Sequence, residues 1–241
     1  MSEDVIAEIA PNGTLRAGIN MSNFLLVTGR TPEGDPDGVS PDLAREIARR
    51  LGVNIKLVPF DSPEKLVDAA GADAWDIGLV GAEPQREEKM AFTAAYAEIE
   101  ATYLVREDSP LMAIEEVDKD GMSIVVRDRS AYGLFLKRSI EKANLLLTDS
   151  YDDARERFLN EDIDALAGLR TGLMKDVDNN PNLRILPGKF AAVQQAVGTL
   201  RGNNAAIAYL REVVEDAKAS GLIASFIEKH DARGLSVAPP A

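Results

Sequence analysis

Short apolar runs alternate with longer amphipathic stretches along the first third of the chain. Runs typical of strands occupy Leu15–Ile19, Val53–Phe60 and Trp75–Val80. Between the first two runs, apolar residues recur every three to four positions, which predicts a helix capped by Ser40 and ended by Gly52. The Ser62-Pro63 pair predicts the start of a second helix.

A second set of elements with the same layout follows a break at Asp108–Pro110. The expected elements are, in order, a strand over Ser123–Val126, a helix from a cap at Ser130 through Ala143, a helix opened by the capping box of Ser150 and Asp153, strands over Asp164–Leu166, Arg184–Leu186 and Ala196–Thr199, and a long helix capped by Asn204 and stopped by Gly221.

This order of elements is typical of an α/β protein with parallel strands joined by right-handed crossovers. In such a protein the loops at the carboxyl ends of the strands face a cleft. The two similar sets predict two α/β lobes. Periodicity leaves open whether the last 45 or so residues belong to the second lobe or return to the first.

Composition and charge exclude several classes of function. The 241 residues include 27 basic and 40 acidic side chains, and the net charge of −13 opposes binding to nucleic acids or anionic lipid surfaces. There is no cysteine and a single histidine, His230, so neither a metal site nor a cofactor is expected. His230 itself is expected on a solvated helix face, among Glu228, Lys229 and Asp231. The start of the chain shows no export signal, which leaves the periplasm and the cytoplasm both open.

Several pieces of sequence, taken in order, resemble the type II solute-binding proteins of bacterial ABC importers, in the polar amino acid-binding branch. The matching pieces are Gly13–Ile19, Asp37–Ala44, Trp75–Gly78, Glu83–Arg86 and Phe92–Tyr96.

The resemblance implies a two-lobed type II periplasmic binding protein fold. Each lobe would be a mixed, mostly parallel sheet flanked by helices, with a two-strand hinge between them. The chain would cross between the lobes near Tyr103–Arg106 and return near Val193–Ala196. Lobe one would then comprise residues 1–104 and 195–241, and lobe two residues 105–194.

The resemblance also implies that Arg86 binds the α-carboxylate of a ligand, which suits a planar guanidinium that stays charged when desolvated. The alternative for Arg86 is a surface arginine paired with a neighbouring acid. Gly81, Ala82 and Glu83 precede it in a turn that can present backbone N–H groups to an anion. The stretch from Asp76 to Arg86 is about two residues shorter than in typical members of the branch, which changes the reach of the arginine.

In the second lobe, Arg129 and Ser130 lie at the expected start of a helix, where members of the family bind the ligand carboxylate from the side opposite to the arginine. The alternative for Ser130 is a simple helix cap. Leu169 stands where the family has an aspartate that pairs with the ligand's α-ammonium. Either Glu98 or Glu100 takes that role, or the ligand lacks an α-amino group, because a buried ammonium needs a counter-charge.

The remaining candidate ligand contacts are polar or aromatic. Arg170 would be a second contact to an anion or a surface residue, and Gln195 would contact the ligand or bridge the hinge strands. Asn20, Asn23 and Phe24 follow the first strand, at the mouth of the expected cleft.

The expected function is that of a solute-binding component of an ABC importer. A monomer would capture a small carboxylate, such as an amino acid or a derivative, between hinged lobes and deliver it to a membrane permease. The expected location is the periplasm. Two alternatives stay open: an enzyme resembling the cyclohexadienyl dehydratases, with Glu83, Glu98 or Glu100 as its acid, or a cytoplasmic sensor or scavenger.

Overall fold

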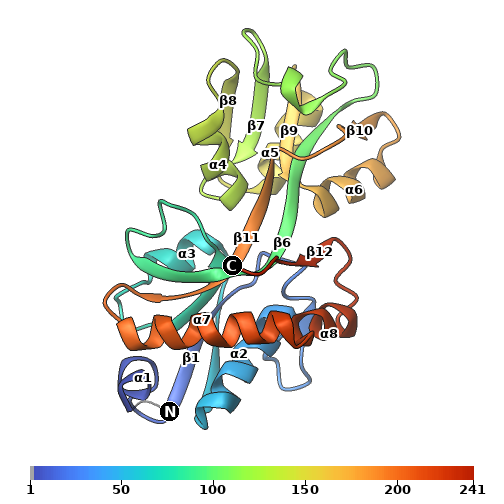
Figure 1. Cartoon of the computed structure of the whole chain (residues 1–241). Coiled ribbons are helices and arrows are strands. Elements are labelled where there is room, and N and C mark those ends of the chain that lie inside the picture. Colours follow the sequence, from blue (N-terminus) through green and yellow to red (C-terminus); the bar gives the residue numbers. More distant parts are fainter. Residues whose placement is uncertain (1–2) are drawn as a thin grey trace. The chain divides into compact units, whose positions relative to one another are not determined.

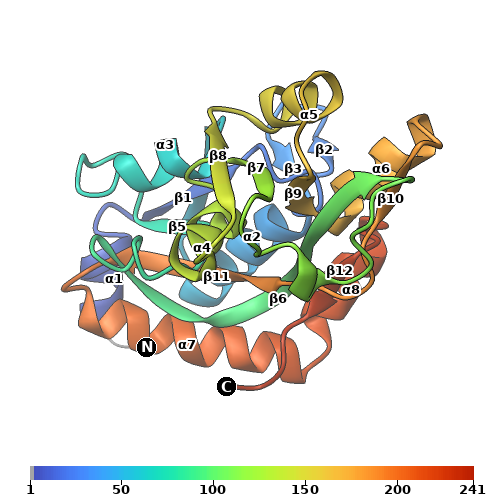
Figure 2. The ribbon, with the colours of Figure 1, turned by 90° about the horizontal axis from the view of Figure 1, so that it is seen from above.

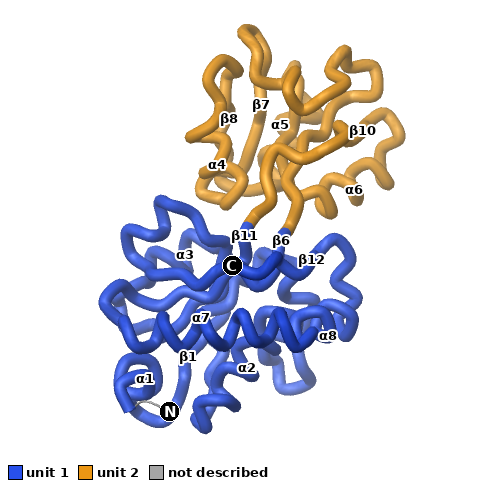
Figure 3. The backbone as a smooth tube through the Cα atoms, in the orientation of Figure 1, with its two compact units in different colours: residues 1–98, 194–241 blue, residues 99–193 orange. Residues whose placement is uncertain are grey.

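A central stretch of the chain, Ile99–Val193, separates from the residues on either side of it (Figure 3). The computed structural model describes residues 3–241. Unit 1 comprises the described residues up to Glu98 together with Gln194–Ala241, and unit 2 is Ile99–Val193. The chain therefore passes into unit 2 after residue 98 and out of it after residue 193, whereas the expected lobes end at residues 104 and 194.

The elements of the two units are labelled in Figure 1. Unit 1 contains α1 (Glu3–Ile9), β1 (Thr14–Asn20), β2 (Gly29–Arg30), β3 (Pro36–Asp37), α2 (Val39–Leu51), β4 (Asn54–Phe60), α3 (Pro63–Asp68), β5 (Ile77–Gly81), most of β11 (Ala191–Leu200), α7 (Asn204–Ala219), α8 (Leu222–Lys229) and β12 (Leu235–Val237). Unit 2 contains the 3₁₀ turn η1 (Ile114–Glu116), β7 (Ser123–Arg127), α4 (Ala131–Ser139), β8 (Asn144–Thr148), α5 (Tyr151–Asn160), β9 (Ala165–Leu169), α6 (Arg170–Asn179) and β10 (Leu183–Ile185). The long strand β6 (Met90–Arg106) begins in unit 1 and ends in unit 2.

The sheet of unit 1 combines parallel strands with an antiparallel return. β1 pairs in parallel with both β4 and β5, and β11 pairs antiparallel with β5. Helix α2 packs on β1 and β4, α3 packs on β1, β4 and β5, and the long helix α7 packs against α1 and α8 (Figures 1 and 2). Residues 194–241 therefore belong to unit 1 together with the first part of the chain.

One face of this sheet is shaped around the only tryptophan, Trp75. Its indole Nε1 donates to the carbonyl oxygen of Leu66, 2.9 Å away, and the ring is buried. A Cβ atom on Gly18 would lie 3.3 Å from Trp75, and one on Gly78 would lie 2.8 Å from the Leu66 side chain. Glycine at these two positions lets the Trp75 and Leu66 side chains pack closely on the strands.

The start of α2 differs from the expectation. Its N-cap is Gly38, with φ 148°, rather than Ser40. The Ser40 backbone N–H and hydroxyl both donate to the carbonyl oxygen of Leu26, so this side chain fixes the preceding loop instead of capping the helix. The predicted end at Gly52 is confirmed, with a left-handed φ of 68°.

Three other helices begin at the serine residues that were predicted to cap them. Ser62, Ser130 and Ser150 each accept a hydrogen bond from a backbone N–H in the first turn, as predicted. α4 ends at Ser139, before the predicted Ala143, because the Asp118 carboxylate accepts from the N–H groups of residues 141–143. The cap of α7 is Asn203, one residue before the prediction.

The sheet of unit 2 repeats the mixed pattern. β7 pairs in parallel with β8 and β9, while β6 pairs antiparallel with β9 and β10. Helices α4, α5 and α6 all pack on β9. Each unit is thus a mixed, mostly parallel sheet flanked by helices, and the predicted α/β class is confirmed. Among helices within residues 3–241, none combines the length and the apolar character needed to cross a membrane.

Candidate functional site

The strand register of unit 1 brings three of the predicted residues to one edge of its sheet. Ile19 lies opposite Leu79 in the parallel pair of β1 and β5, so Asn20 and Gly81 both end their strands at this edge. Gln195, in the middle of β11, lies opposite Gly81 in the antiparallel pair. The carboxyl edge of a parallel sheet is where α/β proteins commonly place their ligands.

Arg86 lies in the turn that follows this edge and is buried, with 4% of its surface exposed. Its Nη1 donates to the carbonyl oxygen of Gly81 at 2.6 Å, and its backbone N–H donates to the carbonyl oxygen of Glu83. Glu83 is also buried, with 7% exposed. The alternative of a solvated surface arginine is therefore wrong. A cation and an acid are thus buried three residues apart in this turn.

The loop after β1 is held by its own polar side chains. Asn20 Oδ1 accepts from the backbone N–H and the hydroxyl of Ser22, and Asn23 Oδ1 accepts from the N–H of Leu25. Asn23 is 7% exposed, whereas the Phe24 ring is 39% exposed. Phe24 is thus the large apolar group that this loop presents to its surroundings.

Gln194 connects β11 to the turn and to β6. The carbonyl oxygen of Gln194 accepts from the N–H of Ala82 at 2.7 Å, and its side-chain Nε2 donates to Glu98 Oε1 at 2.9 Å. Gln195, the predicted residue, is 3% exposed. Glu98 therefore has an amide partner inside unit 1.

In unit 2 the predicted Ser130 is engaged as the cap of α4. Its Oγ accepts from the N–H of Gly133 at 3.0 Å and donates to the carbonyl oxygen of Arg127 at 2.8 Å. Arg129 adopts a left-handed φ of 56° just before it. Gly133 is required here, because an added Cβ would lie 2.3 Å from the carbonyl oxygen of Arg127.

The two acids proposed as substitutes for the missing aspartate fall on β6 but in different units. Glu100, in unit 2, pairs with Arg170 Nε at 2.7 Å and with Lys189 Nζ at 3.3 Å. The hydrogen bond from Arg170 is the main reason why the pKa of Glu100 is lowered, with a further contribution from Lys189 and some opposition from burial. Arg170 also donates to the carbonyl oxygen of Gly188. Leu169 is the residue that precedes α6 and packs against the unit 2 core.

The predicted residues thus form two groups, each described within its own unit. Unit 1 holds Asn20, Asn23, Phe24, Gly81, Ala82, Glu83, Arg86, Glu98 and Gln195, and unit 2 holds Glu100, Arg129, Ser130, Leu169 and Arg170.

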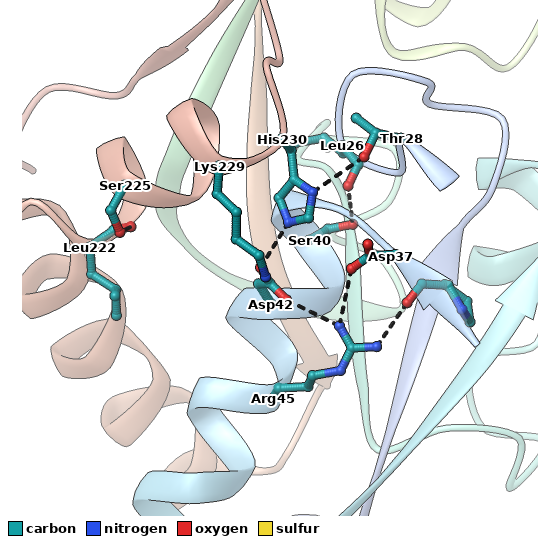
Figure 4. A network of polar contacts seen from close by, with 11 residues as sticks. Leu26, Thr28, Asp37, Ser40, Asp42, Arg45, Leu222, Ser225, Lys229 and His230 are labelled. Atoms are coloured by element: carbon teal, nitrogen blue, oxygen red, sulfur yellow. Dashed lines mark hydrogen bonds and ion pairs between the residues drawn. The ribbon is translucent and has the colours of Figure 1, made fainter. Parts of the chain in front are cut away.

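A buried polar cluster in unit 1 was not foreseen from the sequence (Figure 4). The Asp42 carboxylate, 8% exposed, accepts from His230 Nε2 at 2.8 Å, from Lys229 Nζ at 2.7 Å and from Arg45 Nη1 at 3.1 Å. The expectation of a solvated His230 is wrong, because its side chain is 6% exposed. His230 and Asp42 lie 188 residues apart in sequence, so no local pattern could have revealed this pair.

This cluster has donor atoms that could bind a metal ion, but basic side chains already neutralise its carboxylates. Oxygens of Asp37 and Asp42 and a ring nitrogen of His230 lie within 4.8 Å of one another. However, Lys229 and Arg45 already bind the Asp42 carboxylate, and Arg45 Nη1 lies 3.8 Å from Asp37. A divalent cation would have to displace these two charged side chains. The arrangement therefore fits an ion-paired cluster better than a metal centre.

Comparisons with known proteins agree with this fold. The ABC transporter glutamine-binding protein GlnH of Bacillus subtilis is 20% identical over 223 residues, which cover 91% of this chain and 81% of that protein. Cyclohexadienyl dehydratase of Pseudomonas aeruginosa is 26% identical over 149 residues, covering 60% of this chain and 55% of that enzyme, so the match spans little more than half of the enzyme's length. The crystal structure of a mutant of ArgBP from T. maritima superimposes with a TM-score of 0.73 at 23% identity, covering 95% of this chain and all of that one.

A family model matches most of the chain. The model of the bacterial extracellular solute-binding proteins, family 3, matches residues 15–231, which cover unit 2 and most of unit 1. The similarity to ArgBP supports the type II periplasmic binding protein fold, and GlnH is an amino acid-binding protein of an ABC transporter. The chain therefore belongs to family 3 of the bacterial extracellular solute-binding proteins.

Proposed function

We propose that this protein binds a small carboxylate, such as an amino acid or a derivative, and that the Arg86 guanidinium binds the carboxylate group. The observation that carries the proposal is the burial of Arg86 in the turn after β5, at the carboxyl edge of a parallel sheet. A guanidinium offers parallel donors that match the two oxygens of a carboxylate, and it keeps its charge when water is excluded. The backbone at Gly81 and Ala82 and the side chains of Asn20 and Gln195 would provide further polar contacts from the same edge.

The physiological role that follows is delivery of the captured solute to the permease of an ABC importer, from the periplasm. Membership of the family and the similarity to GlnH support this role. On this proposal the protein changes no covalent bond in its ligand.

Ligand release and thermal stabilisation test the proposal directly. Freshly purified protein is denatured, the released small molecules are identified by mass spectrometry, and the unliganded protein is then screened by thermal shift against the twenty amino acids and their 2-hydroxy and 2-oxo analogues. We expect one or a few of these carboxylates to raise the melting temperature.

Two variants make the screen specific for Arg86. Arg86→Ala should abolish the thermal shift. Arg49→Ala is the matched control, because the Arg49 side chain is 72% exposed and pairs only with Glu46 on its own helix. A shift that survives in Arg86→Ala would contradict the assignment of the carboxylate contact.

A dehydratase activity is the second candidate. Similarity to cyclohexadienyl dehydratase and the burial of the Glu83 carboxyl group, a candidate general acid, favour it. Incubation with prephenate separates the two functions. Consumption of prephenate by the wild-type protein but not by Glu83→Gln would establish the enzyme and reject a purely binding role.

A further inference from the structure

The C-terminal residues 230–239 run from the polar cluster around Asp42 to the strand that leads out of unit 1. His230 is the C-cap of α8 and binds Asp42 of α2. The residues after it turn through left-handed conformations at Asp231 and Gly234 and then enter β12, which pairs with β6. One end of this segment is therefore fixed by side chains and the other by backbone pairing.

The contacts with β6 fall on its last residues inside unit 1. The N–H of Ala238 donates to the carbonyl oxygen of Tyr96 at 3.2 Å. The Ser236 hydroxyl donates to the backbone carbonyl oxygen of Glu98 at 3.4 Å. Glu98 is the residue after which the chain passes into unit 2. Beyond β12, Lys218 Nζ of α7 donates to the carbonyl oxygen of Pro239 at 2.8 Å.

The other end of the segment, at His230, is held by contacts among three separate parts of unit 1. Asp42, near the start of α2, accepts from both His230 and Lys229, and the Thr28 hydroxyl lies 3.4 Å from His230 Nδ1 (Figure 4). Thr28 belongs to the stretch that follows the candidate ligand loop, and its N–H donates to the carbonyl oxygen of Asp37. A neutral imidazole satisfies both contacts at once, since Nε2–H donates to the carboxylate while Nδ1 accepts from the hydroxyl.

We propose that residues 230–239 act as a strap that restrains β6 immediately before the chain enters unit 2, and that the contacts of His230 and Lys229 with Asp42 fasten this strap. The strap holds the carbonyl groups of Tyr96 and Glu98, which belong to one of the two backbone passages between the units. In a protein that works by a hinge motion, the stiffness of such a passage sets how readily the hinge bends.

Hydrogen exchange of the unliganded protein, read by mass spectrometry on peptides, tests the strap without knowledge of the ligand. His230→Ala removes the imidazole contact of the fastening and leaves that of Lys229, and Ala238→Pro removes the N–H that binds Tyr96 while leaving the Asp42 cluster intact. We expect both variants to speed exchange of residues 93–99 and 235–237 at least tenfold, with no change in β7 of unit 2.

Arg233→Ala is the matched control, because Arg233 lies in the same segment, is 87% exposed and pairs only with Asp231. The Arg233→Ala variant should show the same amide hydrogen exchange rates as the wild type. The proposal is overturned if residues 93–99 keep wild-type exchange in Ala238→Pro, or if both variants exchange faster by the same factor everywhere, since the segment would then be an ordinary part of the unit 1 core. Because no ligand is used, either result leaves the proposed carboxylate binding untouched.

Discussion

Nη1 of Arg86 lies 2.6 Å from the carbonyl oxygen of Gly81, the last residue of β5. This hydrogen bond ties a long, flexible side chain to the end of a rigid strand. A guanidinium fixed in this way loses little further rotational freedom when a ligand binds, which favours both affinity and selectivity.

The orientation of the Arg86 fork, and not its charge alone, should matter for binding. Arg86→Lys keeps the positive charge but cannot donate in parallel to two carboxylate oxygens. We expect the dissociation constant for the carboxylate found in the thermal screen to rise by about 10- to 100-fold, equivalent to about 1.4–2.8 kcal/mol. Isothermal titration calorimetry measures the change, and an unaltered affinity would show that Arg86 acts only as a general positive charge.

Glu100 should not be the partner of a ligand ammonium group, because Arg170 and Lys189 already neutralise it. Glu100→Gln is therefore expected to change the affinity for any bound amino acid by less than about threefold, which is below roughly 0.7 kcal/mol. The folding stability should change by no more than about 1 kcal/mol, as is usual for partly exposed ion pairs. A large loss of affinity restricted to ligands with an amino group would instead assign the ammonium contact to Glu100.

The strands of unit 1 were predictable because their signals are local. Leu15–Ile19 and Val53–Phe60 show their apolar pattern within a single strand, and the Ser62-Pro63 pair opens α3 by itself. The predictions of helix boundaries were wrong where a contact with a distant residue determines the boundary. Ser40 binds Leu26 rather than capping its helix, and the Asp118 side chain accepts from the N–H groups that would otherwise extend α4.

In the candidate site, too, local features could be predicted from the sequence, whereas contacts with distant residues could not. The short motif places Arg86 in the turn after β5, where the side chain is buried, and its role as a ligand contact stays a prediction. The partners of Glu98 and Glu100 could not be read from the alternation of β6, because Gln194 and Arg170 come from other strands and helices. Charge balance at a site depends on such neighbours, which only the folded chain brings together.

Protonation of Asp42 should weaken the cluster in acid. Burial raises the pKa of this carboxyl group, but the hydrogen bonds from Lys229 and His230 outweigh burial and hold the pKa below its ordinary value of 3.8. A lowered folded-state pKa means that the stabilisation is fully present above pH 3.8 and is lost as the pH falls through the folded-state value.

Urea unfolding of the wild type and of Asp42→Asn checks this prediction. At pH 7 the variant should be less stable by roughly 1–3 kcal/mol, because its cationic partners lose a charged acceptor. The difference should shrink steadily below pH 3.8. Asp61→Asn, at a side chain that is 85% exposed, should show little difference at any pH. A constant gap between wild type and Asp42→Asn down to pH 2 would contradict the linkage.

The start of α4 should not tolerate a side chain at Gly133. An added Cβ would lie 2.3 Å from the carbonyl oxygen of Arg127, so Gly133→Ala must displace either the helix or the end of β7. We expect a loss of about 1–3 kcal/mol in the free energy of unfolding. Gly29→Ala is the control, because no atom lies within 4 Å of the corresponding Cβ position. Equal stability of the two variants would show that the backbone yields at little cost.

The division of unit 1 into two separated stretches has a consequence for synthesis on the ribosome. Unit 2 is continuous and is fully translated before residues 194–200 of β11, which unit 1 needs to complete its sheet, and before α7. Until then β5, whose five residues are all buried in the finished protein, has an unpaired side that invites pairing with other chains. A nascent chain at this stage is therefore the form most dependent on chaperones.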